Sequence, residues 1–450
     1  MKIILAVFVS LIVTAAAFGQ SAPVWIDSTH SFAIEPGAKI SVAVDSDAWG
    51  AAIVAMWNKA HPNHQGAVTY IHADATGATD KISQLQDSFA DVVLAIDSEV
   101  SRNAQSLLAL DPHLVWLGKH VTQPPFFEDA NPAGSYVYIP LAYNGMVFAY
   151  NKTMLEKLGY SVKTDDVNLP REFNTWEKIF ALAKKWQSDR PFYRGKHVNI
   201  VFPMSLTEVW SAYPSLTADG WEIYGDGNPL DPGFEKASFR GGLDFIKEAS
   251  KADLWVLANG RRIPGSSMTG LNNWDDWLNN QTAPFSLVGT WQDVKGAMAK
   301  GHYKLGFAPM PTWHGNRLTP FVGTKGFVVN GFTHYPSAAE ELYRLLYTRE
   351  AMETMIKTSS YLPALRKDSP ISVSYGGDWV KEEMAKAFQY SYPEPAYFLP
   401  NNQYRKAMDV YYNIPMGQIY SDVWDGKKSP AEGQAEAVAL AKKWLADNNK

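Results

Sequence analysis

Acidic side chains stand where two predicted β-strands end. Asp45 and Asp47 follow a strand predicted over 39–44, and Asp97 follows one predicted over 91–96. Open α/β sheets bind their ligands beyond the carboxyl ends of parallel strands. An ionised carboxylate accepts hydrogen bonds from several donors at once, and charge-assisted bonds are the strong ones. This edge of the sheet is therefore a candidate site for a solute rich in hydroxyl or amino groups.

These acids have two other interpretations. Asp47 precedes a helix predicted over 48–60 and could cap its backbone N–H groups, and Asp97 allows the same interpretation. Capping and ligand binding are compatible roles. The Asp45-Ser46-Asp47 run is not followed by a glycine and glutamate at EF-hand spacing, so we expect no metal site.

Aromatic residues are abundant, with 21 Phe, 22 Tyr and 16 Trp. Most must lie in the core, because aromatic side chains dominate burial. Many stand beside turn residues, however, which hints at an aromatic ligand surface. Trp291, which follows the Gly289-Thr290 turn, is one of these residues.

The search for catalytic motifs is negative. The chain has no His-Glu-x-x-His, Gly-x-Ser-x-Gly or P-loop, and no Gly-x-Gly-x-x-Gly after its first strand. It has no cysteine, which excludes disulfides, thiolate chemistry and cysteine-held metals. We expect no catalytic residue and no cofactor. A secreted glycoside hydrolase remains the enzyme alternative, because such enzymes also combine aromatics with paired carboxylates.

Alternating strands and helices must position these residues, and this pattern predicts βαβ units. The predicted strands are 39–44, 67–71, 91–96, 136–150, 285–288, 303–307 and 326–330; the predicted helices include 48–60, 80–88, 152–158, 239–252 and 274–280. The run Asn174-Thr175-Trp176-Glu177 is expected to be the capped start of a further helix. Ser337 with Glu340, and Ser429 with Glu432, are read as capping boxes. The last helix is expected to place Ala431, Ala435, Val438, Ala441 and Leu445 on one face.

Length and charge narrow the class of protein. A chain of 450 residues exceeds what one hydrophobic core usually serves, so we expect two domains. A net charge of −5 gives no reason to expect a nucleic-acid partner.

Residues 1–19 are typical of a secretory signal peptide, with Lys2, an apolar run and small residues near Ala17. The chain has no cysteine that could carry a lipid anchor. An exported protein without an anchor would diffuse away from a cell with a single membrane, so we expect this protein to be retained in a periplasm.

Several motifs resemble the maltose-binding-protein branch of the extracellular solute-binding proteins that serve ABC importers. Residues 139–152 are similar to the crossover between lobes, and Thr175-Trp-Glu to a family helix start. The most specific match is Ser-Leu-Val-Gly-Thr-Trp at 286–291, followed in order by Gly-Phe-Ala-Pro-Met-Pro-Thr at 306–312 and Pro-Phe-Val-Gly at 320–323.

The resemblance implies an α/β fold of the type II periplasmic-binding kind, with two lobes, mixed and mostly parallel sheets, and a hinge. The expected segments are a first lobe of 20–142 plus 327–367, a second of 147–321 plus 376–450, and hinges near 142–145, 322–327 and 367–375. It also implies a clamp that closes on solute, and a partner permease with its ATPase at the inner membrane. We expect a monomer.

The resemblance also assigns ligand-binding positions. Asp47 and Asp97 match carboxylates that accept bonds from sugar hydroxyls. Asn144 stands where the maltodextrin binder has a carboxylate, and an amide can still read a hydroxyl. The remaining positions, on the second lobe, are a carboxylate and three aromatics: Glu208, Trp210, Trp291 and Tyr404. Structural alternatives stay open for each, such as a hinge-turn role for Asn144 and a core position for either tryptophan.

Together these features predict a binding protein for a sugar, most simply an oligosaccharide. A polyamine or another cationic solute is the runner-up, since acids and aromatics also form a cation cage. Anionic solutes are disfavoured because no arginine cluster accompanies the site, with Lys325 as the one nearby exception.

Overall fold

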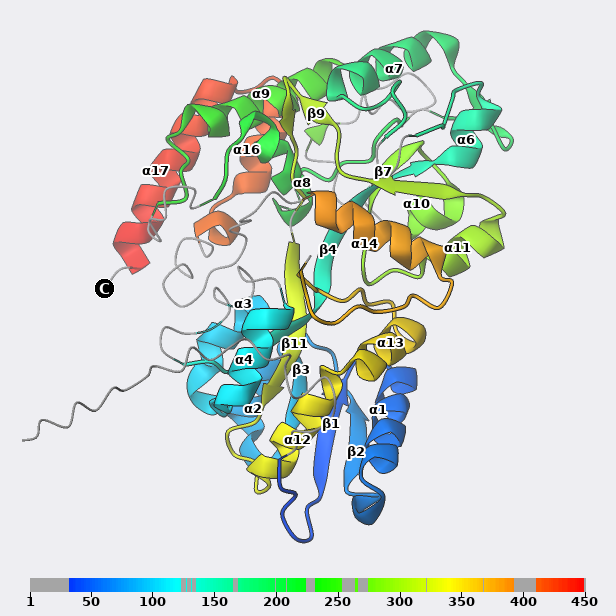
Figure 1. Cartoon of the computed structure of the whole chain (residues 1–450). Helices are drawn as coiled ribbons and strands as arrows, with labels where there is room; N and C mark the ends of the chain where they lie inside the picture. The colour runs from blue at the N-terminus through cyan, green and yellow to red at the C-terminus, as the bar shows by residue number, and fades with distance from the viewer. Residues whose placement is uncertain are drawn as a thin grey trace, which may run out of the picture.

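The computed structural model describes most of the chain (Figure 1). The described residues are 32–122, 127, 131, 135–164, 169–198, 200–207, 209–223, 231–252, 264–265, 274–320, 322–366, 368–391 and 410–448. The predicted signal peptide, Glu208 and Tyr404 lie outside them. Within these ranges, no helix is long and apolar enough to cross a membrane.

Three parallel strands begin the fold. β1 (Ile40–Val44) pairs with both β2 (Val68–His72) and β3 (Val92–Ile96), in parallel. Helices α1 (Asp47–Ala60) and α2 (Ala78–Leu85) connect them, as the alternating pattern predicts. The carboxyl ends of the three strands therefore meet at one edge of the sheet.

Two long strands join this unit to the rest of the chain. The main sheet has the order β2-β1-β3-β11-β4-β7, with β8 also paired to β4. β11 (Val322–Val329) is antiparallel to both β3 and β4 (Ile139–Asn151), with an irregularity between Lys325 and Gly326. β7 (Phe285–Gly289) and β8 (Leu305–Ala308) are antiparallel to β4. The sheet is mixed as predicted, but the expectation of mostly parallel pairing is wrong. Among its described strands, β1 pairs in parallel with β2 and β3, whereas the pairs made by β11, β4, β7 and β8 are antiparallel.

Figure 1 shows two lobes, with β4 and β11 passing from one to the other. The short segments of the first lobe are η2 (Pro62–His64), η3 (Gln86–Ser88), α3 (Asp97–Val100) and η4 (Ser101–Ser106). Its further helices are α4 (Pro112–Val121), α12 (Pro336–Leu346) and α13 (Arg349–Thr358). The second lobe carries α6 (Lys152–Lys157), α7 (Trp176–Asp189), α8 (Val209–Leu216), η5 (Thr217–Asp219), α9 (Ala237–Lys251), α10 (Trp274–Asn280), α11 (Val294–Gly301), α14 (Trp379–Ser391), α16 (Met416–Trp424) and α17 (Pro430–Asn448). Its short hairpins are β5 (Phe192–Tyr193) with β6 (Lys196–His197), and β9 (Thr312–Trp313) with β10 (Asn316–Arg317).

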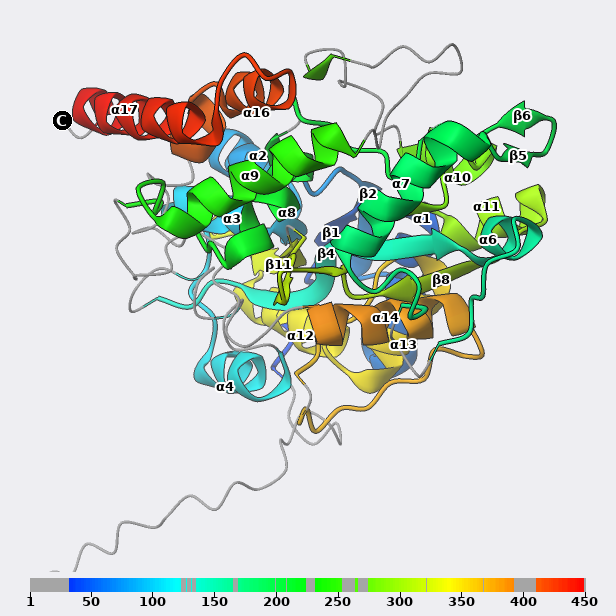
Figure 2. The ribbon, with the colours of Figure 1, turned by 90° about the horizontal axis from the view of Figure 1, so that it is seen from above.

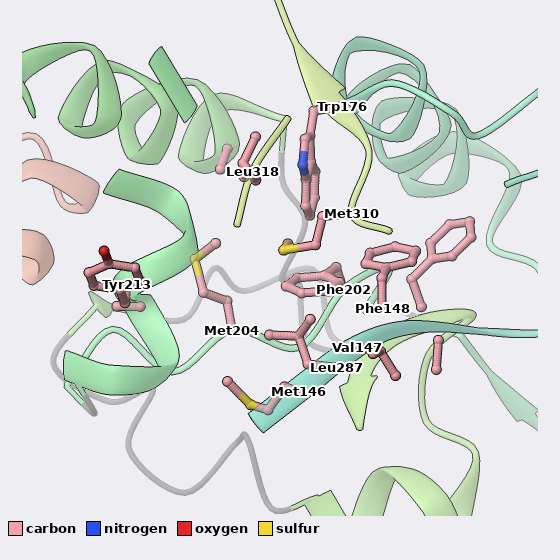
Figure 3. Packing of buried hydrophobic residues seen from close by; sticks show 14 of the residues in the cluster. Met146, Val147, Phe148, Trp176, Phe202, Met204, Tyr213, Leu287, Met310 and Leu318 are labelled. Carbon is pink, nitrogen blue, oxygen red and sulfur yellow. The ribbon is translucent and has the colours of Figure 1, made fainter. Parts of the chain in front are cut away.

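Separate hydrophobic cores form on the two sides of this crossover. The core of the second lobe begins at Tyr143 on β4 and includes Val322, whereas Ala142 and Phe327 belong to the core of the first lobe. In the second lobe, the Trp176 ring of α7 packs edge-on against Phe202, with ring centroids 5.1 Å apart (Figure 3). Trp176 also packs against Phe148 of β4 and Phe245 of α9, so α7 connects this part of the sheet to α9, which lies beside α7 in Figure 2. Each lobe therefore buries its own apolar surface.

Local capping sets several helix starts. Thr175 accepts a hydrogen bond from the Lys178 N–H and caps α7, as predicted. Ser429 and Glu432 form the predicted reciprocal box at α17, with bonds of 2.7 and 3.2 Å. The expected face of α17 is only partly right. Ala441 is buried, but Ala431 and Ala435 are exposed. Gly433 and Ala437 are buried in their place, so the contact face is rotated from the predicted one.

The predicted capping box at Ser337 is wrong. Helix α12 begins one residue earlier, at Pro336. The carboxylate of Glu35, far away in sequence, accepts hydrogen bonds from the Ser337 and Ala338 N–H groups, each of 2.8 Å. Glu340 instead accepts a bond from the Asp111 N–H. A long-range cap thus replaces the local one and ties the start of the described chain to α12.

Candidate functional site

The carboxyl ends of β1 and β2 bring together Asp47 and His72. The Asp47 Oδ1 lies 3.0 Å from the His72 Nδ1, and both side chains are largely exposed. The N-cap of α1 is Ser46, whose hydroxyl accepts a bond from the Trp49 N–H, so the capping interpretation of Asp47 is wrong. Asp47 occupies the first turn of α1, where the helix dipole favours a negative charge. Its carboxylate is open to solvent and able to accept further donors.

Asp97 follows β3 but is 1% exposed. One oxygen accepts bonds from the Thr324 N–H and, at 2.7 Å, from the Thr324 hydroxyl, and the other accepts from the Ser98 N–H at 2.7 Å. Burial raises the pKa of the Asp97 carboxyl to about 7, against the lowering effect of these bonds. In this conformation protein donors occupy both oxygens. Asp97 therefore fastens β3 to β11 at the crossover.

Asn144 lies on β4 at the same crossover. It is half-buried and stands opposite Gly323 of β11. The neighbouring Gly145 packs closely, since a Cβ there would lie 2.7 Å from a Val322 methyl. The Thr290 hydroxyl donates to the Tyr143 carbonyl at 3.0 Å. These contacts bring the end of β7 beside Asn144.

Trp291 directly follows that end of β7. It is 40% exposed, which excludes the core position that sequence alone left open. Its indole lies against Gly289, where a Cβ would come within 2.4 Å of the ring. The Gln292 side chain accepts a bond from the Gly289 N–H at 3.0 Å and holds this turn. Trp291 is thus a supported ring with an accessible surface, beside the crossover that carries Asn144.

Two other tryptophans lie in the cores of the lobes. Trp49 and Trp313 are buried, Trp49 against Phe327 and Trp313 against Phe180. Trp210 lies in α8, but its side chain is outside the described part of the chain. Asp97 and Asn144 therefore both lie next to Gly323 of β11 at the crossover, and Trp291 follows β7, which pairs with β4. Asp47 stands at the carboxyl ends of β1 and β2.

Sequence reasoning missed one polar cluster. The Lys325 ammonium on β11 lies 3.1 Å from the Asp45 Oδ2 and 2.5 Å from the Tyr361 hydroxyl. The Tyr361 hydroxyl also donates to Asp45. Lys325 was recognised as a lone cation, but nothing in the sequence pairs it with residues about 280 and 36 positions away. The position of Asp45 at a strand end was the one usable signal.

A large cavity of about 520 Å³ lies elsewhere. Its lining, in the second lobe, includes Lys163, Arg171, Glu172, Asn174 and Arg317. None of the predicted ligand residues that the structure describes lines it. Among the described residues there is no group of three or more His, Cys, Asp or Glu able to hold a metal ion.

Comparison with known proteins identifies the class. A family model for bacterial extracellular solute-binding proteins matches residues 52–385, well over half of the chain. The chain belongs to this family. The solute-binding protein is also 25% identical, over 218 residues, to the maltodextrin-binding protein MdxE of Bacillus subtilis (strain 168). The match covers 46% of this chain and 45% of that relative, so it spans about half of the relative's length.

A solved structure has the same fold as this solute-binding protein. The maltose-binding periplasmic protein MalE from Listeria monocytogenes, in complex with maltose, matches with a TM-score of 0.69 at 18% identity. The match covers 91% of this chain and 98% of that one. The two-lobed α/β fold expected from the sequence is therefore confirmed.

Proposed function

We propose that this solute-binding protein captures a sugar, an oligosaccharide in particular, and delivers it to an ABC importer. The observation that carries the proposal is the accessible ring of Trp291, held beside Asn144 at the crossover of the two lobes. A sugar offers an apolar face to such a ring and hydroxyls to Asp47 and Asn144. The names of the two similar proteins, which bind maltodextrin and maltose, support a sugar as the solute class.

The proposed mechanism is closure of two lobes around the solute. We propose lobes of 20–142 plus 327–367 and 147–321 plus 376–450, with hinges near 142–145, 322–327 and 367–375. The division of the hydrophobic core between Ala142 and Tyr143 supports the first hinge. A solute that contacts both lobes binds the closed state better and shifts the population toward it. Binding then needs no covalent chemistry, and we expect no enzymatic turnover.

The cellular setting is part of the proposal. The predicted signal peptide and the absence of cysteine support export to a periplasm without a lipid anchor. Delivery requires a permease with its ATPase at the inner membrane, and the binding protein would act as a monomer. Glu208, Trp210 and Tyr404 are proposed to complete the site from the second lobe.

A cationic solute such as a polyamine is the second candidate. Asp47 is exposed at the strand ends, and Asp74 is exposed after β2. The Thr76 N–H holds the pKa of Asp74 below its ordinary value, so this carboxylate stays charged. Carboxylates and an aromatic ring are the parts of a cation cage.

A thermal-shift screen separates these candidates, using mono-, di- and oligosaccharides, polyols and polyamines. Hits are then titrated by calorimetry at low and high salt. A sugar should bind with little salt dependence, because no net charge is neutralised, whereas a polyamine should weaken steeply. Turnover of a glycoside would promote the hydrolase alternative. Binding of polyamines alone would overturn the sugar proposal.

A further inference from the structure

A charged cluster occupies the carboxyl end of β1. It consists of Asp45, Lys325 and Tyr361, and is called the Lys325 cluster below. The lysine ammonium lies 3.1 Å from Asp45 and 4.8 Å from the centre of the Tyr361 ring. Lys325 is 8% exposed as a residue, and the Asp45 side chain is 20% exposed. The cluster is thus rigidly held, yet its rim reaches the solvent.

Three different parts of the first lobe build this cluster. Asp45 follows β1, Lys325 belongs to β11, and Tyr361 follows α13. The Tyr361 ring also packs against Trp49, with centroids 5.8 Å apart. Burial, and then the charge of Asp45, raise the pKa of Tyr361, so its hydroxyl stays a donor to the carboxylate. Such a set of contacts fixes the ammonium at the strand ends rather than in bulk solvent.

The cluster changes the charge that a solute meets there. Without Lys325, a solute at the strand ends would meet the carboxylates of Asp45, Asp47 and Asp74. His72, which contacts Asp47, is the basic side chain beside them. Lys325 lies close enough to Asp45 to cancel its charge, and it also helps to lower the pKa of Asp74. Asp97, at the end of β3, is buried and bonded to β11. A cationic solute entering the edge would approach a fixed ammonium, and a like charge at close range opposes binding.

We propose that Lys325 sets the solute specificity of this edge, by neutralising Asp45 and holding a fixed positive charge there, so that neutral polyhydroxylated solutes bind and organic cations are disfavoured. The inference rests on the proposed function, because it assigns a selectivity to the same site. Asp45 and Lys325 together still offer an acceptor and a donor to a neutral hydroxyl.

The test measures whether removal of the Lys325 charge makes the protein bind an organic cation more tightly. Removal of a lysine with only a structural role would not produce such a gain. Spermidine is titrated by calorimetry against wild type and Lys325→Met at about 20 mM and about 150 mM salt. The variant should bind spermidine about tenfold tighter or more at low salt, since one close repulsive charge is removed. The gain should shrink at the higher salt through screening.

Matched variants isolate the cause. Lys59→Met removes the same charge from an exposed pair with Glu350 at the other end of α1, and should leave spermidine binding unchanged. Lys325→Arg keeps the positive charge and should also show no gain. Lys325→Gln retains hydrogen bonding to Asp45, and replaces the Met variant if that variant fails to fold.

The outcomes separate this inference from the proposed function. A folded Lys325→Met or Lys325→Gln protein with no gain in spermidine affinity would overturn the role of Lys325, whatever sugar the wild type binds. Tight spermidine binding by the wild type would overturn it as well. A wild type that binds no sugar would refute the proposed function, while a gain of cation binding in the variant would still support the role of Lys325.

Discussion

Removal of the Trp291 ring distinguishes a ligand platform from a packing residue. Trp291→Ala should weaken sugar binding by about 2–4 kcal/mol, the usual loss for an aromatic anchor in a binding site. That corresponds to roughly 30- to 1,000-fold in dissociation constant, at about 1.4 kcal/mol per tenfold. The ring is 40% exposed and touches the Gly289 turn, so its removal should cost only about 1–2 kcal/mol of folding stability.

One variant is measured twice, by calorimetric titration with the tightest sugar and by urea unfolding of the ligand-free protein. Trp313→Ala is the buried control, because that ring packs against Phe180 and Phe245 with centroids 5.3 and 5.6 Å away. It should lose about 3–5 kcal/mol of stability and retain its affinity. Phe192→Ala, an exposed aromatic on the β5–β6 hairpin, should change neither. Normal affinity in Trp291→Ala would refute the platform.

Three further predictions follow from buried or close contacts. Burial raises the folded-state pKa of Asp97 to about 7, so folding favours its protonated form. Protonated Asp97 therefore contributes its whole stabilisation below about pH 4, and this contribution is lost as the pH rises toward 7. Between pH 4 and pH 8, urea unfolding should show that the free energy of unfolding falls by roughly 3–5 kcal/mol more in wild type than in Asp97→Asn. Parallel pH dependences of the two proteins would contradict this prediction. Glu35→Ala should cost about 1 kcal/mol by uncapping α12, seen as a lower thermal midpoint; an unchanged midpoint would count against the cap. Gly145→Ala should destabilise by about 1–3 kcal/mol by clashing with Val322, and a neutral denaturation curve would argue against that contact.

The sequence predicted local structure well where the residues that determine it lie close together along the chain. The strand before Asp45 and the helices at 48–60 and 274–280 follow from periodicity and turn residues alone. The Ser429–Glu432 box was also predictable, because both partners lie within one helical turn. The family motifs added the two-lobed fold, which periodicity cannot give.

Contacts between distant segments could not be predicted in the same way. The cap of α12 comes from Glu35, about 300 residues away, and outcompetes the local Ser337 signal. Asp97 stands at a strand end as expected, yet β11 supplies the donors that bury it. The Lys325 cluster depends on the position of Tyr361 after α13. Each of these results from the packing of separate segments.

The central claim, a clamp that closes on a sugar, is tested most directly by small-angle X-ray scattering. The radius of gyration is measured for the ligand-free protein and again with the tightest sugar from the screen, at a concentration that calorimetry shows to be saturating. Closure around a solute bound by both lobes predicts a smaller radius in the complex. An unchanged radius at saturation would contradict the clamp.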